Sequence, residues 1–150
     1  MKPMPKAERL AALVSNVTET MLGISFLPAA EVTAHPSLTW RTAIMLVDGP
    51  RPVSVGLSSD ETGCSTLAAA MFGCKPDGVD VGMINDALCE LVNMTAGLLK
   101  GALSLDQALG LPRVAEGDDP HVVRAHAGPH VLVLRAREVG LMLWVLQGNA

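Results

Sequence analysis

The sequence predicts an α+β fold in which long helices pack on an antiparallel sheet. Apolar residues recur at helical spacing in residues 6–22 and 81–103, whereas residues 40–47, 130–137 and 141–147 alternate or run apolar between turn residues. The predicted order is a helix, two strands and a helix, followed by a helix and three strands. Because the strands are grouped rather than alternating singly with helices, this order favours helices layered on an antiparallel sheet.

Length and composition indicate one domain, residues 1–150, with an aliphatic core. The chain has 150 residues, of which 49% are hydrophobic, yet it contains two Phe, two Trp and no Tyr. A chain of this length can bury a continuous core without disulfides or metals. The three cysteines, Cys64, Cys74 and Cys89, lack the spacing of metal or redox sites, so we expect buried, reduced thiols.

Charge and hydropathy exclude two classes of partner. The net charge is -4 with a pI near 5.5, and Lys and Arg do not cluster as phosphate-backbone binding requires, so nucleic acid is not expected. No apolar run approaches the roughly 20 residues of a membrane span, and the amino terminus lacks the apolar run of a signal peptide. We therefore expect a cytoplasmic protein.

The first predicted helix covers residues 6–22, and Gly23 is placed to end it. Prolines in residues 27–30 and 34–37 indicate a connection with one short extended piece. A hairpin follows, with its turn at residues 48–50.

A capping box is predicted next, with Ser58 at the cap and Glu61 three residues on. It would open a second helix that ends near Phe72 and Gly73.

The second half begins with the helix of residues 81–103, followed by a short extra turn at 104–109. Three strand-like runs close the chain, at residues 121–126, 130–137 and 141–147. Residues 141–146 are apolar at every position, so we expect a central strand covered on both faces.

One narrow polar line crosses the long helix of the second half. Asp86, Glu90, Asn93 and Gly97 fall on a single helix face, and the other faces are apolar. A solvated helix face is the simplest interpretation. However, Asn and Gly are poor choices for a helix interior. Together with a rim that includes Met94, they favour a surface on which a partner docks.

The first helix carries a similar pattern, which indicates an internal duplication. Ser15 and Glu19 have the spacing of Asp86 and Glu90, but Leu22 stands where the second helix has Asn93.

These residues resemble the signature of the CheC/CheX/FliY phosphatases of bacterial chemotaxis. The matching run is Asn85 to Gly97, followed by residues 109–112, Leu-Gly-Leu-Pro. The signature occurs once in this chain, as in the CheX branch. The resemblance implies a CheC-like fold with pseudo-duplicated helix-hairpin-helix and helix-three-strand halves.

The resemblance further implies hydrolysis of the phospho-aspartate of a CheY-like receiver domain. Asn93 would orient the attacking water and Glu90 would pair with the receiver's lysine; these two are the catalytic candidates. Asp86, Met94, Gly97 and Lys100 would help to dock the partner. An acyl phosphate is already activated, so positioning a water is the missing contribution. No cofactor is expected on this chain, and Mg²⁺ would be bound by the receiver.

Other interpretations remain open at this stage. The chain could keep the fold as a catalytically silent binding or scaffold module, and a homodimer is expected from the resemblance. A metal site built from His121, His126 and His130 is not expected, because no acidic or thiolate ligand accompanies them in the pattern.

Overall fold

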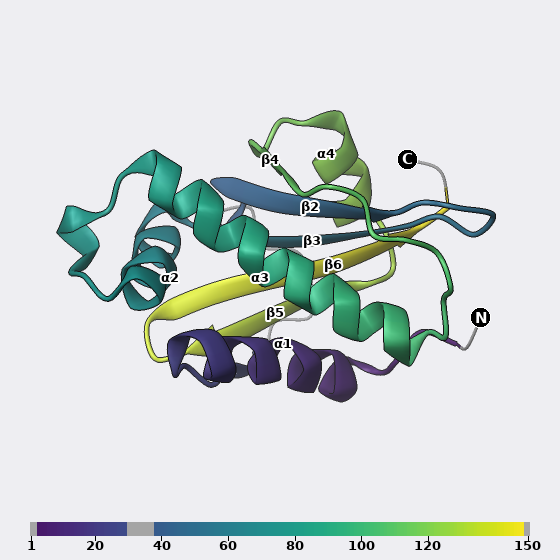
Figure 1. Cartoon of the computed structure of the whole chain (residues 1–150), viewed down its shortest axis with the longest axis horizontal. Coiled ribbons are helices and arrows are strands. Elements are labelled where there is room, and N and C mark those ends of the chain that lie inside the picture. Colours follow the sequence, from purple (N-terminus) through teal and green to yellow (C-terminus); the bar gives the residue numbers. More distant parts are fainter. Residues whose placement is uncertain (1–2, 30–37, 149–150) are drawn as a thin grey trace.

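The computed structural model describes residues 3–29 and 38–148, and it is an α+β fold (Figure 1). Its elements in chain order are α1 (Ala7–Leu22), β1 (Leu27–Pro28), β2 (Arg41–Val47), β3 (Val53–Ser59), α2 (Glu61–Phe72), the 3-10 helix η2 (Pro76–Gly78), α3 (Val81–Ala102), β4 (Arg113–Ala115), α4 (Pro120–His126), β5 (Val131–Ala136) and β6 (Val139–Gln147). The predicted connection at residues 34–37 lies outside the described residues.

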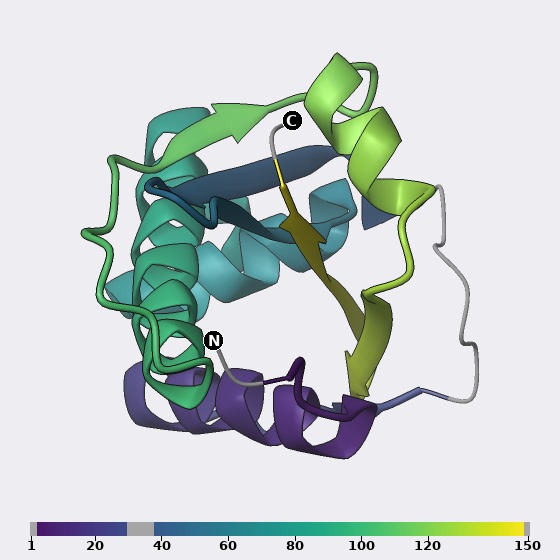
Figure 2. The same ribbon diagram turned by 90° about the vertical axis from the view of Figure 1, so that its right-hand side faces the viewer.

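Six strands form one antiparallel sheet in the order β1-β5-β6-β3-β2-β4. Helices α1, α2 and α3 cover one face, and α4 packs on the other face against β6 (Figures 1 and 2). β6 lies third in this order, between β5 and β3, and residues 141–145 are buried. The prediction of a central strand covered on both faces is therefore confirmed.

The core is divided by the sheet into two parts. Leu141, Leu143 and Val145 point into the large cluster beneath the three helices, whereas Trp144 packs with α4 on the opposite face. The Trp144 ring lies across Gly56 of the neighbouring strand, where a Cβ atom would fall 2.1 Å from the ring. Only glycine fits beneath this indole, so Gly56 fixes how β3 and β6 pack under α4.

The sheet has an internal twofold topology. The first half of the chain contributes α1, β1, β2 and β3, and the second half contributes α3, β4, β5 and β6 in the same order. If each strand is replaced by its counterpart in the other half, the strand order of the sheet is the same when it is read from the opposite edge. Each half also gives its first strand to the other half, because β1 pairs with β5 and β4 pairs with β2. This arrangement agrees with the duplication predicted from the two helices.

Most of the predicted elements are present. The helices of residues 6–22 and 81–103 agree with α1 and α3 to within one residue, and Gly23 ends α1 in the left-handed conformation at φ 70°. The hairpin is formed by β2 and β3, and the last two predicted strands are β5 and β6.

The predicted cap of α2 is wrong. Ser58 lies inside β3, where it pairs with Thr42, and the N-cap is Asp60, whose carboxylate accepts the Gly63 N–H at 2.7 Å. Strand pairing continues through Ser59, so the helix can begin only after it.

The strand predicted at residues 121–126 is also wrong, because this segment is helix α4. Pro120 occupies the first turn, and Asp119 caps the helix by accepting the His121 N–H at 2.9 Å. The third strand of the second half is instead β4, which was not predicted because three residues are too few for a visible alternation.

Two smaller predictions also differ from the structure. Residues 104–109 form an irregular connection instead of an extra helical turn, with Ser104 at φ 54° and Leu109 bridged to Val47. Of the three thiols only Cys64 is buried, since Cys74 is exposed after the end of α2 and Cys89 is half-buried.

In the ranges 3–29 and 38–148, no helix has the length and apolar character needed to cross a membrane.

Candidate functional site

Helix α3 is positioned by its apolar face and by its N-cap. Asp80 accepts the Met83 N–H at 2.8 Å and so satisfies a free donor of the first turn. The side chains that anchor the helix on the sheet are Ile84, Ala87, Leu88, Leu91, Val92, Thr95, Ala96 and Leu99. Because these face the core, the opposite side of α3 is left at the surface of the molecule (Figure 1).

The predicted polar line is this exposed side. Asp86, Glu90, Asn93 and Gly97 are all exposed, whereas the flanking Met94 and Lys100 are half-buried. The structure therefore brings the predicted site residues together on one face.

The polar side chains of this face are free to meet a partner. Within the part of the chain that the structure describes, no hydrogen bond or ion pair engages the side chains of Glu90 and Asn93. An exposed carboxylate and carboxamide side by side on a rigid helix can donate, accept and pair with a cation without first breaking an internal contact.

Gly97 is open to the outside. A Cβ atom at Gly97 would meet nothing within 4 Å, and the same holds for Gly101 one turn further on. The fold thus does not require glycine at either position, although each costs about 1 kcal/mol relative to Ala in a helix.

The Asp86 carboxylate affects the pKa of the half-buried Cys89 thiol on the same helix. Burial raises the pKa of the Cys89 thiol, and the nearby Asp86 carboxylate raises it further. The thiol of Cys64 is more strongly affected, because burial and then Asp60 raise its pKa to about 12. Both thiols are therefore protonated at neutral pH and have little nucleophilic character.

The matching residues of α1 have a different environment. The Phe26 N–H donates to Ser15 Oγ at 3.2 Å, and Ser25 Oγ donates to the Glu19 carboxylate. Leu22 is half-buried against the core instead of pointing out as Asn93 does. The first copy of the pattern is therefore engaged with its own chain.

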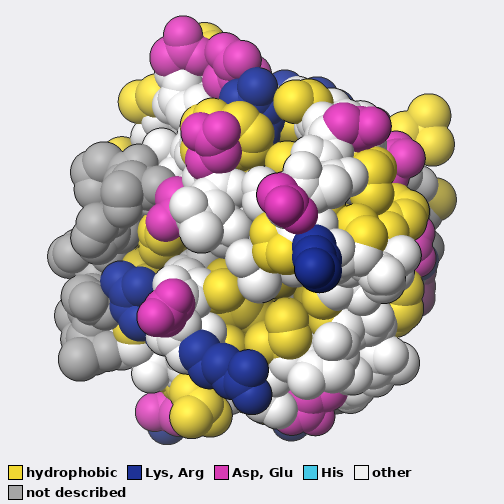
Figure 3. All heavy atoms as spheres, turned by 90° about the vertical axis from the view of Figure 1, so that its left-hand side faces the viewer, with side chains coloured by type: hydrophobic (Ala, Val, Ile, Leu, Met, Phe, Trp, Pro, Cys, Tyr) yellow, Lys and Arg dark blue, Asp and Glu magenta, His cyan; other side chains and the backbone are white. Residues whose placement is uncertain are grey.

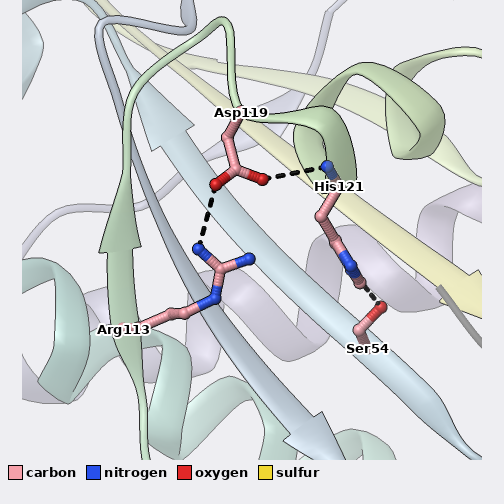
Figure 4. A network of polar contacts seen from close by, with 4 residues as sticks. All are labelled: Ser54, Arg113, Asp119 and His121. Carbon is pink, nitrogen blue, oxygen red and sulfur yellow. Dashed lines mark hydrogen bonds and ion pairs between the residues drawn. The ribbon is translucent and has the colours of Figure 1, made fainter.

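A polar network that was not predicted from the sequence joins α4 to the sheet (Figure 4). Ser54 Oγ lies 2.9 Å from His121 Nε2, and Arg113 pairs with Asp119 at 3.1 Å. The residue types are those of a hydrolase triad, but Asp119 contacts the backbone N–H of His121 and not its ring. Ser54 is 1% exposed. The network fastens α4 to the sheet, and the Ser54 hydroxyl within it is closed to a substrate.

The pKa values in this network have clear causes. Burial lowers the pKa of His121, and Arg113 and Arg124 lower it further, so the ring is neutral near pH 7. The hydrogen bond from Arg113 lowers the pKa of Asp119, assisted by the bond from the His121 N–H.

Residues 3–29 and 38–148 contain no group of three or more His, Cys, Asp or Glu side chains that could hold a metal ion. Within this part of the chain, His121 instead bonds to Ser54, and burial alone lowers the pKa of His126.

The chain matches the model of one protein family over more than half of its length. The family model of the chemotaxis phosphatase CheX matches residues 41–134, which include β2, α3 and most of β5. The chain belongs to the CheX family. This assigns it to a family of chemotaxis phosphatases and confirms the branch that the single signature predicted. No curated protein was found to match the chain.

Solved structures with the same fold include CheX of Vibrio vulnificus, 16% identical, covering 99% of this chain and 100% of that one with a TM-score of 0.72. CheX of Borrelia burgdorferi, in a complex with CheY, BeF3 and Mg²⁺, is 16% identical over 98% of this chain and 100% of that one, also at 0.72. A CheC-like superfamily protein from Shewanella is 17% identical over 93% and 95%, at 0.67. These similarities establish the CheC-like fold.

Proposed function

We propose that this CheX-family chain hydrolyses the phospho-aspartate of a CheY-like response regulator, using the exposed face of α3. The observation that carries the proposal is that Glu90 and Asn93 lie together on this face. Both are exposed, and neither side chain has an internal partner in the described residues. The family's phosphatase description and the CheX–CheY complex of a structural neighbour support it.

Asn93 positions the attacking water. The amide oxygen of Asn93 accepts a hydrogen bond from the water and holds it in line with the bond to be broken. The water oxygen attacks phosphorus, the bond between phosphorus and the aspartyl oxygen breaks, and inorganic phosphate and a free carboxylate result. The carboxamide has no useful pKa, so it contributes by orientation, and Mg²⁺ bound by the receiver stabilises the charge on the phosphoryl group.

Glu90 holds the receiver in register. Its carboxylate lies one helical turn before Asn93 and pairs with a lysine of the receiver, a charge-assisted contact that fixes orientation. Asp86 and Met94 extend the contact surface on either side. Lys100 lies in the last turn of α3, where it also complements the helix dipole.

Gly97 leaves room for the receiver to approach Asn93. Gly97 follows Asn93 by one turn on the same exposed face, and no neighbouring atom fills the space above it. A backbone without side chains lets the receiver approach the amide of Asn93 more closely than any larger residue would.

The direct test measures phosphate release from a phosphorylated CheY-type receiver with Mg²⁺ in the presence of the chain. We expect acceleration, and we expect Asn93→Ala to remove it, by about a hundredfold or more if water positioning is the main contribution. Thr20→Ala, an exposed substitution on α1, is the matched control and should leave the rate unchanged.

No acceleration with any receiver from the same genome would refute the proposal. Equal capture of the phosphorylated and unphosphorylated receiver, with an unchanged lifetime of the phosphate, would instead identify the chain as a scaffold module. Thermal unfolding of each variant distinguishes loss of activity from loss of folding.

The homodimer expected from the family is a further proposal, tested by light scattering. The edge strands β1 and β4 are only 2 and 3 residues long. Pairing of two copies into one continuous sheet would therefore gain few hydrogen bonds, so side chains would have to carry most of such an interface.

A further inference from the structure

A groove runs between α1 and β1 at the edge of the molecule. Its volume is about 420 Å³, within the range of about 300–1,000 Å³ typical of ligand pockets. Its lining includes Glu8, Ala12, Ser15, Glu19, Leu27 and Pro28. Helix α1 lies over β1 and β5, while α3 lies over β2 and β3 (Figure 2). Because residues of α1 and β1 line the groove, it is on the far side of α1 from the candidate site.

The groove is preformed. The two hydrogen bonds that Ser15 and Glu19 accept from residues 25–26 tie its two walls together. The small side chain of Ala12 leaves space above α1, and Leu27 stands on the opposite wall with 69% of its surface exposed. An apolar side chain of a partner could enter without rearrangement of the chain.

The rim of the groove is acidic. Glu8 and Glu19 are both exposed and point within about 20° of one another, about 16 Å apart along the helix. In the described part of the chain neither has a Lys or Arg within ion-pair distance, and no Lys or Arg lines the groove. Ser25 Oγ donates to only one oxygen of the Glu19 carboxylate. A cationic partner would therefore gain two ion pairs without displacing an internal ion pair.

A second hollow provides an internal contrast. It measures about 400 Å³ and lies near the turn between β5 and β6, with Ile24, Ala136 and Arg137 among its lining residues. It is on the side of the molecule seen in Figure 3, where hydrophobic side chains stand beside Lys and Arg. Its lining includes one cation, Arg137, and no carboxylate, so the acidic pair is a feature of the α1 groove and not of this hollow.

We propose that the α1 groove is a docking site for a protein segment that carries bulky apolar side chains between two basic residues. The apolar side chains rest on Ala12 and Leu27, and the two cations pair with Glu8 and Glu19. This site is separate from α3, so it would bring a second protein to the phosphatase without covering Asn93.

The test is an NMR titration of the full chain with a capped six-residue peptide that has lysine at both ends and two leucines between them. An extended peptide of this length spans about 16 Å between its lysines. We expect shifts of the Ala12, Asn16 and Leu27 amides, weakened by added salt. A peptide with glutamate at both ends should cause no such shifts.

Three variants sharpen the result. Glu8→Gln combined with Glu19→Gln should weaken binding by about two- to tenfold, the effect of two exposed ion pairs. Ala12→Lys should abolish it by placing a cation in the groove. Glu61→Gln, an exposed substitution on α2, should have no effect.

Any of three outcomes would overturn the proposal: no shifts, shifts that persist unchanged in the charge-neutralised variant, or shifts confined to another surface. Concentration-dependent shifts of the same amides without peptide would assign the groove to a second copy of the chain, and would also overturn it. Phosphatase assays of the groove variants keep this test independent of the proposed function, because their rates should equal that of the unmodified chain.

Discussion

Helices α1 and α3 carry the same spacing of polar residues in the two halves of the fold, but their surroundings differ. After α1, residues 23–26 turn back at once and place Ser25 and Phe26 against Ser15 and Glu19. After α3, the longer connection of residues 103–112 runs on to β4.

The face of α3 consequently stays open. The connection after each helix, as well as the residues on it, therefore decides whether the polar pattern is bonded to its own chain.

The largest expected effect comes from giving α3 the residue that α1 carries. Asn93→Leu should lower receiver dephosphorylation by about a hundredfold or more, since no group remains to orient the water. Stability should change little, because the position is exposed. Phosphate release and thermal unfolding measure the two effects. The reverse change, Leu22→Asn, should confer no activity on α1; a gain of activity would show that the two faces are equivalent.

The next largest effect on the phosphatase rate should come from Glu90 and not from its counterpart Glu19. Glu90→Gln should weaken the reaction about tenfold, the loss of one charge-assisted contact to the receiver. Glu19→Gln should leave the rate unchanged, because the Glu19 carboxylate is engaged by Ser25. Rates measured against receiver concentration test this, and a larger loss in Glu19→Gln than in Glu90→Gln would reverse the assignment of the two helices.

Stability should depend more on the polar residues of α1 than on those of α3. Ser15→Ala removes the acceptor of the Phe26 N–H and should lower the free energy of unfolding by about 1 kcal/mol. Asp86→Ala, at the matching position of α3, breaks no hydrogen bond within the described chain and should change it by less than about 0.5 kcal/mol. Urea unfolding compares the two variants, and equal losses would contradict the contrast.

Replacing a glycine by alanine should change the free energy of unfolding in opposite directions at the two helices. Gly97→Ala should raise the free energy of unfolding by about 0.5–1 kcal/mol, because the helix gains a better residue and the new Cβ meets nothing within 4 Å. Gly23→Ala should lower it by about 1 kcal/mol, because Gly23 ends α1 at φ 70°, which favours glycine. Stabilisation by both substitutions would refute this prediction.

The buried His121 beside α4 makes stability depend on pH without involving either helix. The pKa of His121 is lowered on folding, so the unfolded chain binds the proton more readily. This contribution to stability is full above about pH 6.5 and is lost as the pH falls towards the lower pKa of the folded state. Urea unfolding at several pH values should show the loss, and His121→Gln should flatten it while leaving the phosphatase rate unchanged.

Elements with a strong local pattern could be predicted from the sequence. Helical spacing located α1 and α3, and apolar runs located β5 and β6, because the period of a pattern reports which face must be buried. The exposed line of Asp86, Glu90 and Asn93 followed from the same spacing. Glu90 and Asn93 as the catalytic pair remain a prediction, drawn from the resemblance to the family.

Other features depend on contacts between residues that are distant in the sequence. Pairing with β2 carries β3 through Ser59, which moved the start of α2 to Asp60. Residues 121–126 contain two adjacent valines that favour a strand, yet the Asp119-Pro120 start and packing on Trp144 make this segment a helix. Asp119 followed by Pro120 was the signal that could have revealed it.

The pairing of β1 with β5 and of β4 with β2 has no local signal at all, because strands of two and three residues gain their stability only from the sheet they join. That pairing places Ser25 and Phe26 over α1. Local sequence therefore determined which faces are polar, whereas long-range pairing determined which of the two polar patterns is bonded to its own chain.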